Sequence, residues 1–97
     1  MRHFRVALFD VISGTADEVI AIARAGLVPI FESQPGFVRY EVGVLDDGGI
    51  LSFSIWETAD EAQRAVDLAA DFVKDNLANR ERLRDEHTGE VAWDDPA

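Results

Sequence analysis

Two capping boxes constrain the fold of this chain more than any other feature of its sequence. Residues Thr15–Glu18 and Thr58–Glu61 both read Thr-Ala-Asp-Glu. In a capping box the threonine oxygen and the glutamate side chain satisfy backbone N–H groups that the first helical turn leaves unpaired, so each box predicts a helix start. Apolar residues recur at helical spacing after both boxes, over Val19–Ile30 and Ala62–Leu77. We therefore expect two amphipathic helices, with Pro29 kinking or ending the first.

Four β-leaning segments surround these helices. Phe4–Val11 precedes the first helix, and Phe37–Leu45 and Ile50–Glu57 flank the turn-forming segment Asp46–Gly49 between the helices. His87–Trp93 is the predicted last strand. The order strand, helix, strand, strand, helix, strand is the ferredoxin-like βαββαβ arrangement of the α+β class, with an antiparallel sheet. We expect one such domain over residues 1–97.

The register of the central hairpin sorts the strand residues onto two faces. A two-residue or four-residue turn places Tyr40 opposite Ile55 and Arg39 opposite Trp56. Two helices can cover only one face of a four-stranded sheet, and we expect them on the fully apolar one. Its members are Phe4, Val6, Leu8, Val38, Tyr40, Val42, Val44, Leu51, Phe53 and Ile55.

The other, mixed face predicts a homodimer. It keeps more apolar surface than a soluble monomer usually exposes, and the same face of a second copy would cover it. Arg39 and Trp56 are the candidate residues of this dimer face, as a cation–π pair or as simple packing. The apolar members of the mixed face are Ala7, Phe9, Phe37, Leu45, Ile50 and Trp56.

The composition excludes several classes of partner and site. A formal net charge of −10 disfavours nucleic acid and anionic membrane surfaces, which both attract cationic proteins. No cysteine is present, which removes disulfides and thiolate sites. We predict no metal site, because His3 and His87 are the only histidines and neither lies in a ligand-spacing motif. The apolar N-terminal stretch is too short for a membrane span or a signal peptide, so a cytoplasmic location is expected.

One possible ligand pocket lies between the second helix and the sheet. Tyr40, Phe53, Phe72 and Asn76 are its candidate lining residues, and they would suit a small aromatic molecule. The alternative is purely structural. Tyr40 would then belong to the core with its hydroxyl at the edge, and Asn76 would cap a helix that frays between Asn76 and Leu83.

The segments Pro35–Val42 and Ser54–Thr58 resemble the antibiotic-biosynthesis-monooxygenase-like domains, and Leu27–Pro29 is similar too. The resemblance spans nearly the whole chain and implies a dimeric α+β barrel, with Trp56 as a structural match. Members include cofactor-free quinol monooxygenases and haem-degrading enzymes. The haem degraders of this type use an asparagine on the first strand, where Ala7 stands here, and a tryptophan and a histidine that the second helix of this chain lacks.

The resemblance therefore implies a monooxygenase without a cofactor, acting on a small aromatic or quinol-type molecule. The alternative is a non-catalytic module that binds a small ligand or serves dimerisation. A cavity with convergent polar groups would favour the enzyme, whereas a cavity without them, or no cavity, would favour the module.

Overall fold

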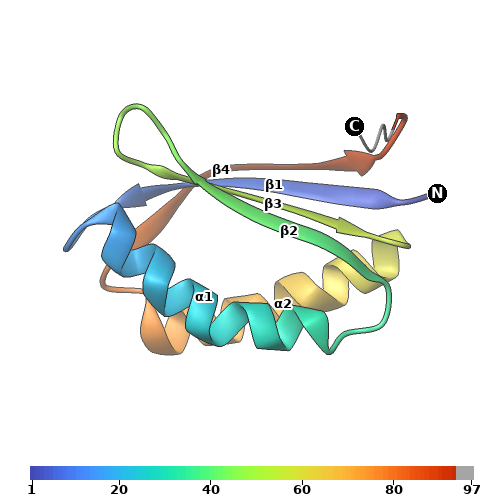
Figure 1. The fold of residues 1–97 in the computed structure, drawn as a ribbon, viewed down its shortest axis with the longest axis horizontal. Helices are drawn as coiled ribbons and strands as arrows, with labels where there is room; N and C mark the ends of the chain where they lie inside the picture. The colour runs from blue at the N-terminus through green and yellow to red at the C-terminus, as the bar shows by residue number, and fades with distance from the viewer. Residues whose placement is uncertain (94–97) are drawn as a thin grey trace.

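The protein folds into a four-stranded antiparallel sheet with both helices on one face, as the predicted ferredoxin-like order requires (Figure 1). The computed structural model describes residues 1–93. The sheet order is β2-β3-β1-β4, so β2 and β4 are the edge strands. No helix in this part of the chain is both long and apolar enough to cross a membrane. The elements are β1 (His3–Val11), α1 (Ala16–Glu32), β2 (Phe37–Val44), β3 (Ile50–Trp56), α2 (Ala59–Asn76) and β4 (Glu81–Glu90).

Both predicted helix starts form, each with the threonine half of its capping box in place. The Glu18 N–H donates to Thr15 Oγ1, and the Glu61 N–H donates to Thr58 Oγ1, each at 3.2 Å. Of the two outcomes expected at Pro29, a kink or an early end, the early end is wrong, because α1 continues to Glu32. A proline removes only its own N–H from the helical ladder, and the turns on either side still hold.

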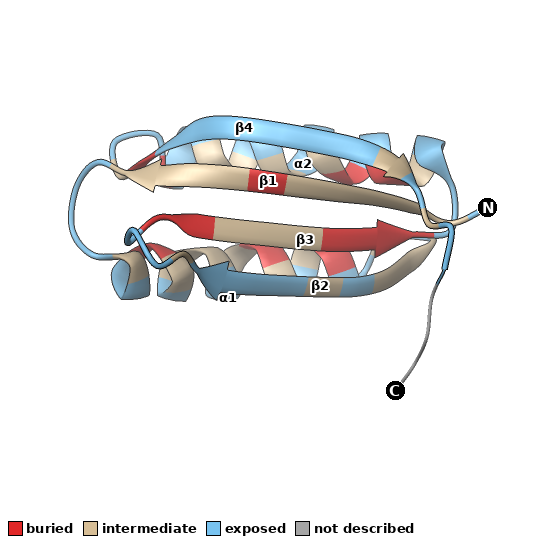
Figure 2. Ribbon diagram, turned by 90° about the horizontal axis from the view of Figure 1, so that it is seen from above, coloured by how far each residue is buried: buried red, intermediate tan, exposed pale blue. Residues whose placement is uncertain are grey.

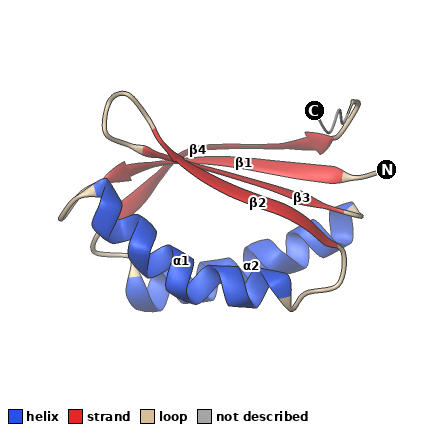
Figure 3. Cartoon of the chain, viewed as in Figure 1, coloured by secondary structure: helices blue, strands red, loops and turns tan. Residues whose placement is uncertain are grey.

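The central hairpin is one residue out of the predicted register. The Leu45 N–H donates to the Gly49 carbonyl at 2.8 Å, and the Gly48 N–H donates to the Leu45 carbonyl at 2.9 Å. Gly48 has a φ of +90°, so the loop holds three residues and ends in a left-handed glycine. Tyr40 therefore pairs with Ser54 instead of Ile55. This loop rises from the sheet on the side away from the helices (Figure 3).

Because side chains alternate along a strand, the shift places Tyr40 and Val42 of β2 on the same side of the sheet as Ser52 and Ser54 of β3, beneath the helices. Trp56 is 1% exposed beneath the helices, with its ring centroid 5.4 Å from that of Phe31 on α1. Phe53 lies on the opposite side, stacked on Phe4 at 6.3 Å. The prediction that the fully apolar face carries the helices is thus wrong for its β1 and β3 residues, whereas Tyr40 and Val42 of β2 do lie on the helix side. We call the side turned away from the helices the outer face (Figure 2), and its apolar members include Phe4, Val6, Leu8, Leu51, Phe53 and Ile55.

The last strand also lies elsewhere than predicted. It begins at Glu81 and ends at Glu90, whereas the prediction was His87–Trp93. β4 is an edge strand with many charged residues, so its sequence lacks the apolar alternation by which strands are usually recognised. Cross-strand pairs compensate this charge, for example Arg84 Nη2 with Asp10 Oδ1 at 2.7 Å.

Small residues set the spacing of the helix layer. Gly26 of α1 faces Phe72 of α2, and a Cβ at Gly26 would overlap the Phe72 ring. Ala62 and Ala65 of α2 are buried against Trp56. The helices therefore approach each other closely above the sheet.

Candidate functional site

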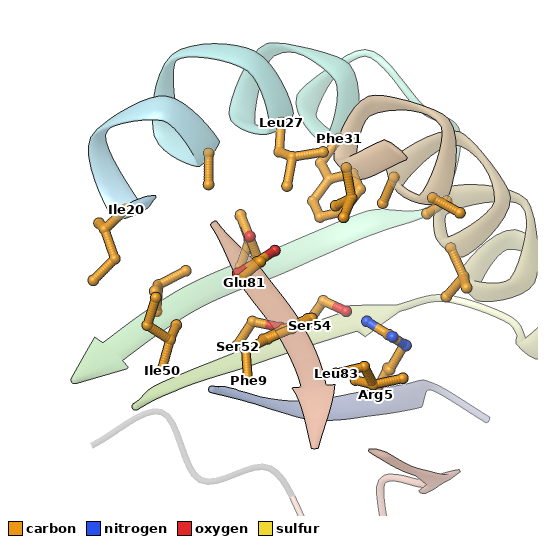
Figure 4. Close-up of a pocket in the computed structure, with 18 of the residues that line it drawn as sticks. Arg5, Phe9, Ile20, Leu27, Phe31, Ile50, Ser52, Ser54, Glu81 and Leu83 are labelled. Atoms are coloured by element: carbon orange, nitrogen blue, oxygen red, sulfur yellow. The ribbon is translucent and has the colours of Figure 1, made fainter. Parts of the chain in front are cut away.

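A cavity of about 210 Å³ lies between the helices and the sheet (Figure 4). Small side chains on the two central strands create this space, since Ala7 on β1 lies beside Ser52 on β3. The helices contribute only apolar groups to the cavity wall. These are Val19, Ile20, Ala23, Leu27 and Phe31 from α1, and Ala65, Val66, Ala69, Ala70 and Val73 from α2.

All polar side chains of the cavity wall come from the sheet. They are Arg5 on β1, Tyr40 on β2, Ser52 and Ser54 on β3, and Glu81 at the start of β4. The register positions Arg5, Ser54 and Tyr40 side by side on three neighbouring strands. An apolar cavity with a few convergent polar groups is the usual form of a small-molecule site.

Arg5 is oriented by an ion pair with its neighbour on β4. Its Nε and Nη2 atoms donate to Glu86 Oε2 at 3.2 and 2.8 Å, and its side chain is only 18% exposed. The third nitrogen, Nη1, makes no such bond within residues 1–93. A cation held in this way is suited to bind an anionic oxygen in the cavity.

Glu81 is a nearly buried carboxylate, with the residue 8% exposed. Its backbone N–H donates to the Leu77 carbonyl at 3.0 Å, which fixes the start of β4 against the end of α2. Within residues 1–93 its side chain makes neither a hydrogen bond nor a salt bridge, and its carboxylate oxygens keep some accessible surface. Burial raises the pKa of the Glu81 carboxyl above its ordinary value.

Tyr40 shares this electrostatic environment. Burial first, and then the negative charge of Glu81, raise the pKa of the Tyr40 phenol to about 12, while the positive charge of Arg5 acts in the opposite direction. The phenol is therefore neutral at physiological pH and remains a hydrogen-bond donor. Its ring packs edge-on against Phe31, with centroids 4.8 Å apart.

Of the four predicted pocket residues, only Tyr40 lines the cavity. Phe53 lies on the outer face, and Phe72 packs between the helices against Gly26. Asn76 is exposed and its Nδ2 donates to the Phe72 carbonyl at 3.0 Å, so it caps the end of α2, as the structural alternative predicted. Placing these three residues around the cavity was wrong, because Phe53 faces away from the helices while Phe72 and Asn76 make their contacts with the helices themselves.

The two residues predicted for the dimer face lie on opposite sides of the sheet. Arg39 is exposed on the outer face, where its Nε donates to Glu41 Oε1 at 2.9 Å. Trp56 lies under the helices and lines the cavity, so its predicted pairing with Arg39 is wrong.

Sequence reasoning missed Arg5, Ser52, Ser54 and Glu81. The three-residue turn was the available signal for the serines, because it places them on the same face as Tyr40 and Val42. Glu81 fell in a segment that the sequence pattern assigned to a fraying helix end.

No group of three or more metal-ligating side chains occurs in residues 1–93. His87 is exposed, and its Nε2 lies 2.9 Å from Asp85 Oδ2.

The chain belongs to the antibiotic biosynthesis monooxygenase family, whose model matches residues 2–74. Among solved structures it is similar to SnoaB, a cofactor-independent oxygenase from Streptomyces nogalater, with a TM-score of 0.74 and 19% identity over 99% of this chain and 98% of that one.

Two further structures share the fold. A monooxygenase from the gene ActVA-Orf6 of Streptomyces coelicolor, in complex with nanaomycin D, gives a TM-score of 0.71 at 15% identity over 94% of this chain and 88% of that one. Rv0793 from Mycobacterium tuberculosis gives 0.73 at 11% identity over 100% of both chains. No curated protein sequence matches this chain.

Proposed function

We propose that this protein is a cofactor-independent monooxygenase that oxidises a small hydroxylated aromatic compound with molecular oxygen. The observation that carries the proposal is the cavity, where five polar side chains converge from the sheet within an otherwise apolar wall. Family membership supports the same reaction class. The likeness to SnoaB supports the absence of a cofactor.

The proposed reaction balances without another reductant. A phenol with a free ring C–H para to its hydroxyl reacts with O2 to give a quinone and water. The aromatic substrate loses four electrons and O2 gains four. Because the substrate itself supplies the electrons, the protein has to hold the ring, exclude water and manage the phenolic proton.

The cavity volume limits the substrate to a small ring system. An apolar cavity of about 150 Å³ accommodates benzene. The cavity here, at about 210 Å³, is somewhat larger. We therefore propose substrates of one or two fused rings, with hydroxylated naphthalenes as first candidates.

Oxygen consumption tests this function. Mono- and dihydroxynaphthalenes that keep a free ring C–H para to a hydroxyl are incubated with the protein in an oxygen-electrode cell, and quinone is quantified by absorbance. We expect one O2 consumed per quinone formed and no hydrogen peroxide. Ser52→Leu, which fills the cavity, should abolish uptake, whereas Gln63→Leu on the exposed side of α2 should not. Circular dichroism checks that both variants fold, and a panel without uptake would refute the proposal.

The non-catalytic alternative predicts a cavity without convergent polar groups. Because polar side chains from all four strands line this cavity, the structure favours the enzyme. Binding of these ligands without oxygen uptake would support the alternative.

We also propose that the protein works as a homodimer in the cytoplasm, without nucleic acid or membrane partners. The support is the apolar outer face, the net charge of −10 and the absence of cysteine.

A further inference from the structure

We propose that Glu81 accepts the proton of a phenolic hydroxyl bound in the cavity, and that Arg5 holds the resulting phenolate oxygen. This inference rests on the proposed function, because it takes the cavity as an aromatic-substrate site. It adds the identity of the proton acceptor and restricts the ligands to those with an ionisable ring hydroxyl.

The position of Glu81 is the first argument. A carboxylate that loses its water shell without a bonding partner is unfavourable, so such groups are normally paired. Glu81 is 8% exposed, lines the cavity and has no side-chain partner in residues 1–93 (Figure 4). A hydroxyl donor inside the cavity would supply the missing hydrogen bond.

The second argument is the set of charges around Glu81. Tyr40 on β2 and Arg5 on β1 are the titratable groups that share its cavity, and Glu86 neutralises part of the Arg5 charge from outside. Neither helix contributes a charged residue to the cavity wall. Burial raises the pKa of Glu81, which makes the carboxylate a stronger base toward a weakly acidic phenol.

The proposed step is a proton transfer. The phenolic O–H bond breaks, the proton forms a bond with a carboxylate oxygen of Glu81, and the electron pair remains on the ring oxygen. Arg5, through its unbonded Nη1, stabilises that new negative charge. The phenolate is richer in electrons than the phenol and is the form that reduces O2 in the proposed reaction.

Binding without turnover tests the assignment directly. Calorimetric titrations under anaerobic conditions compare α-naphthol with its methyl ether, which has the same rings but no O–H. We expect wild-type protein to prefer the naphthol about tenfold, since hydrogen bonds to charged groups are the stronger class. The preference should weaken as the pH falls and Glu81 is protonated. Glu81→Gln should remove most of it, and Glu90→Gln, an exposed position on the same strand, should retain it.

Kinetics supply a second measurement. Glu81→Gln should lower kcat/KM roughly a hundredfold to ten-thousandfold for a naphthol that is neutral at the assay pH. The loss should be much smaller for a nitro-substituted naphthol that is already ionised. A purely structural role of Glu81 would reduce both rates equally.

The two proposals fail in different ways. Selective naphthol binding that depends on Glu81, without oxygen uptake, would overturn the proposed function and leave the Glu81 assignment standing. Oxygen uptake with a naphthol preference unchanged in Glu81→Gln would overturn the Glu81 assignment alone. A wild-type protein that binds neither ligand, or both equally, would also overturn it.

Discussion

Tyr40 is the only tyrosine of the chain, so its ionisation can be followed without interference from another phenol. Its environment raises its pKa to about 12, from about 10 in an unfolded chain. The tyrosinate absorbance of native protein should therefore appear about two pH units later than that of urea-unfolded protein. A native titration near pH 10 would show that Tyr40 is not in the cavity environment described above.

The same shift has a consequence for stability. Between about pH 10 and 12 the unfolded chain has released the Tyr40 proton and the native protein has not, so the free energy of unfolding falls as the pH rises. The total loss from this group is roughly 2–3 kcal/mol. Tyr40→Phe should be insensitive to pH in this window. Urea denaturation of both proteins at two alkaline pH values measures the difference, and Phe37→Leu provides an aromatic-to-aliphatic control.

Among single residues, the sequence identified Tyr40 as a cavity residue but failed to identify Glu81 or Arg5. Tyr40 is aromatic and lies in a strand with a clear pattern. Glu81 and Arg5 are charged, and a charged residue in a sequence is ordinarily solvent-exposed. Their burial depends on the cavity between the helices and the small residues Ala7 and Ser52. That cavity exists only once the strands and helices are packed together.

At the level of elements, a single glycine determines which side chains reach the cavity. Gly48 has a φ of +90° and closes the three-residue loop that sets the β2–β3 register. Both capping boxes and the element order were predictable because they depend on local spacing. The register depends on a choice between turns that differ by one residue in length, and Asp46–Gly49 is compatible with more than one of them.

Gly48→Ala should therefore destabilise the protein by about 1–2 kcal/mol, the usual cost of a left-handed conformation for an L-residue. A Cβ at Gly48 would meet no atom within 4 Å, so the cost is conformational and not a clash. Gly43→Ala is the matched control, because a Cβ there also meets nothing within 4 Å and its φ is not positive. Urea unfolding of the two variants should separate them, and equal stabilities would contradict the turn described here.

For the whole molecule, the outward position of the apolar β1 and β3 side chains changes which surface should form the dimer. The sequence predicted a dimer through the mixed face, but that face is occupied by the helices and the cavity. The outer face carries partly buried apolar side chains instead, among them the stacked rings of Phe4 and Phe53. Sheet-to-sheet packing of two such faces buries alternate side chains of every strand. The prediction of a dimer thus remains, with a different set of contact residues.

Phe53→Asp should shift the protein to the monomer, because a carboxylate would be buried against the partner sheet without a compensating charge. Leu68→Asp is the matched control, since Leu68 is 39% exposed on α2 and lies away from the outer face. Light scattering coupled to size-exclusion chromatography gives the masses.

Each copy carries a formal charge of −10, so salt should screen the repulsion between copies and strengthen association. A wild-type mass of one chain at high protein and salt concentration would refute the dimer. A dimer that survives Phe53→Asp would place the interface elsewhere than the outer face.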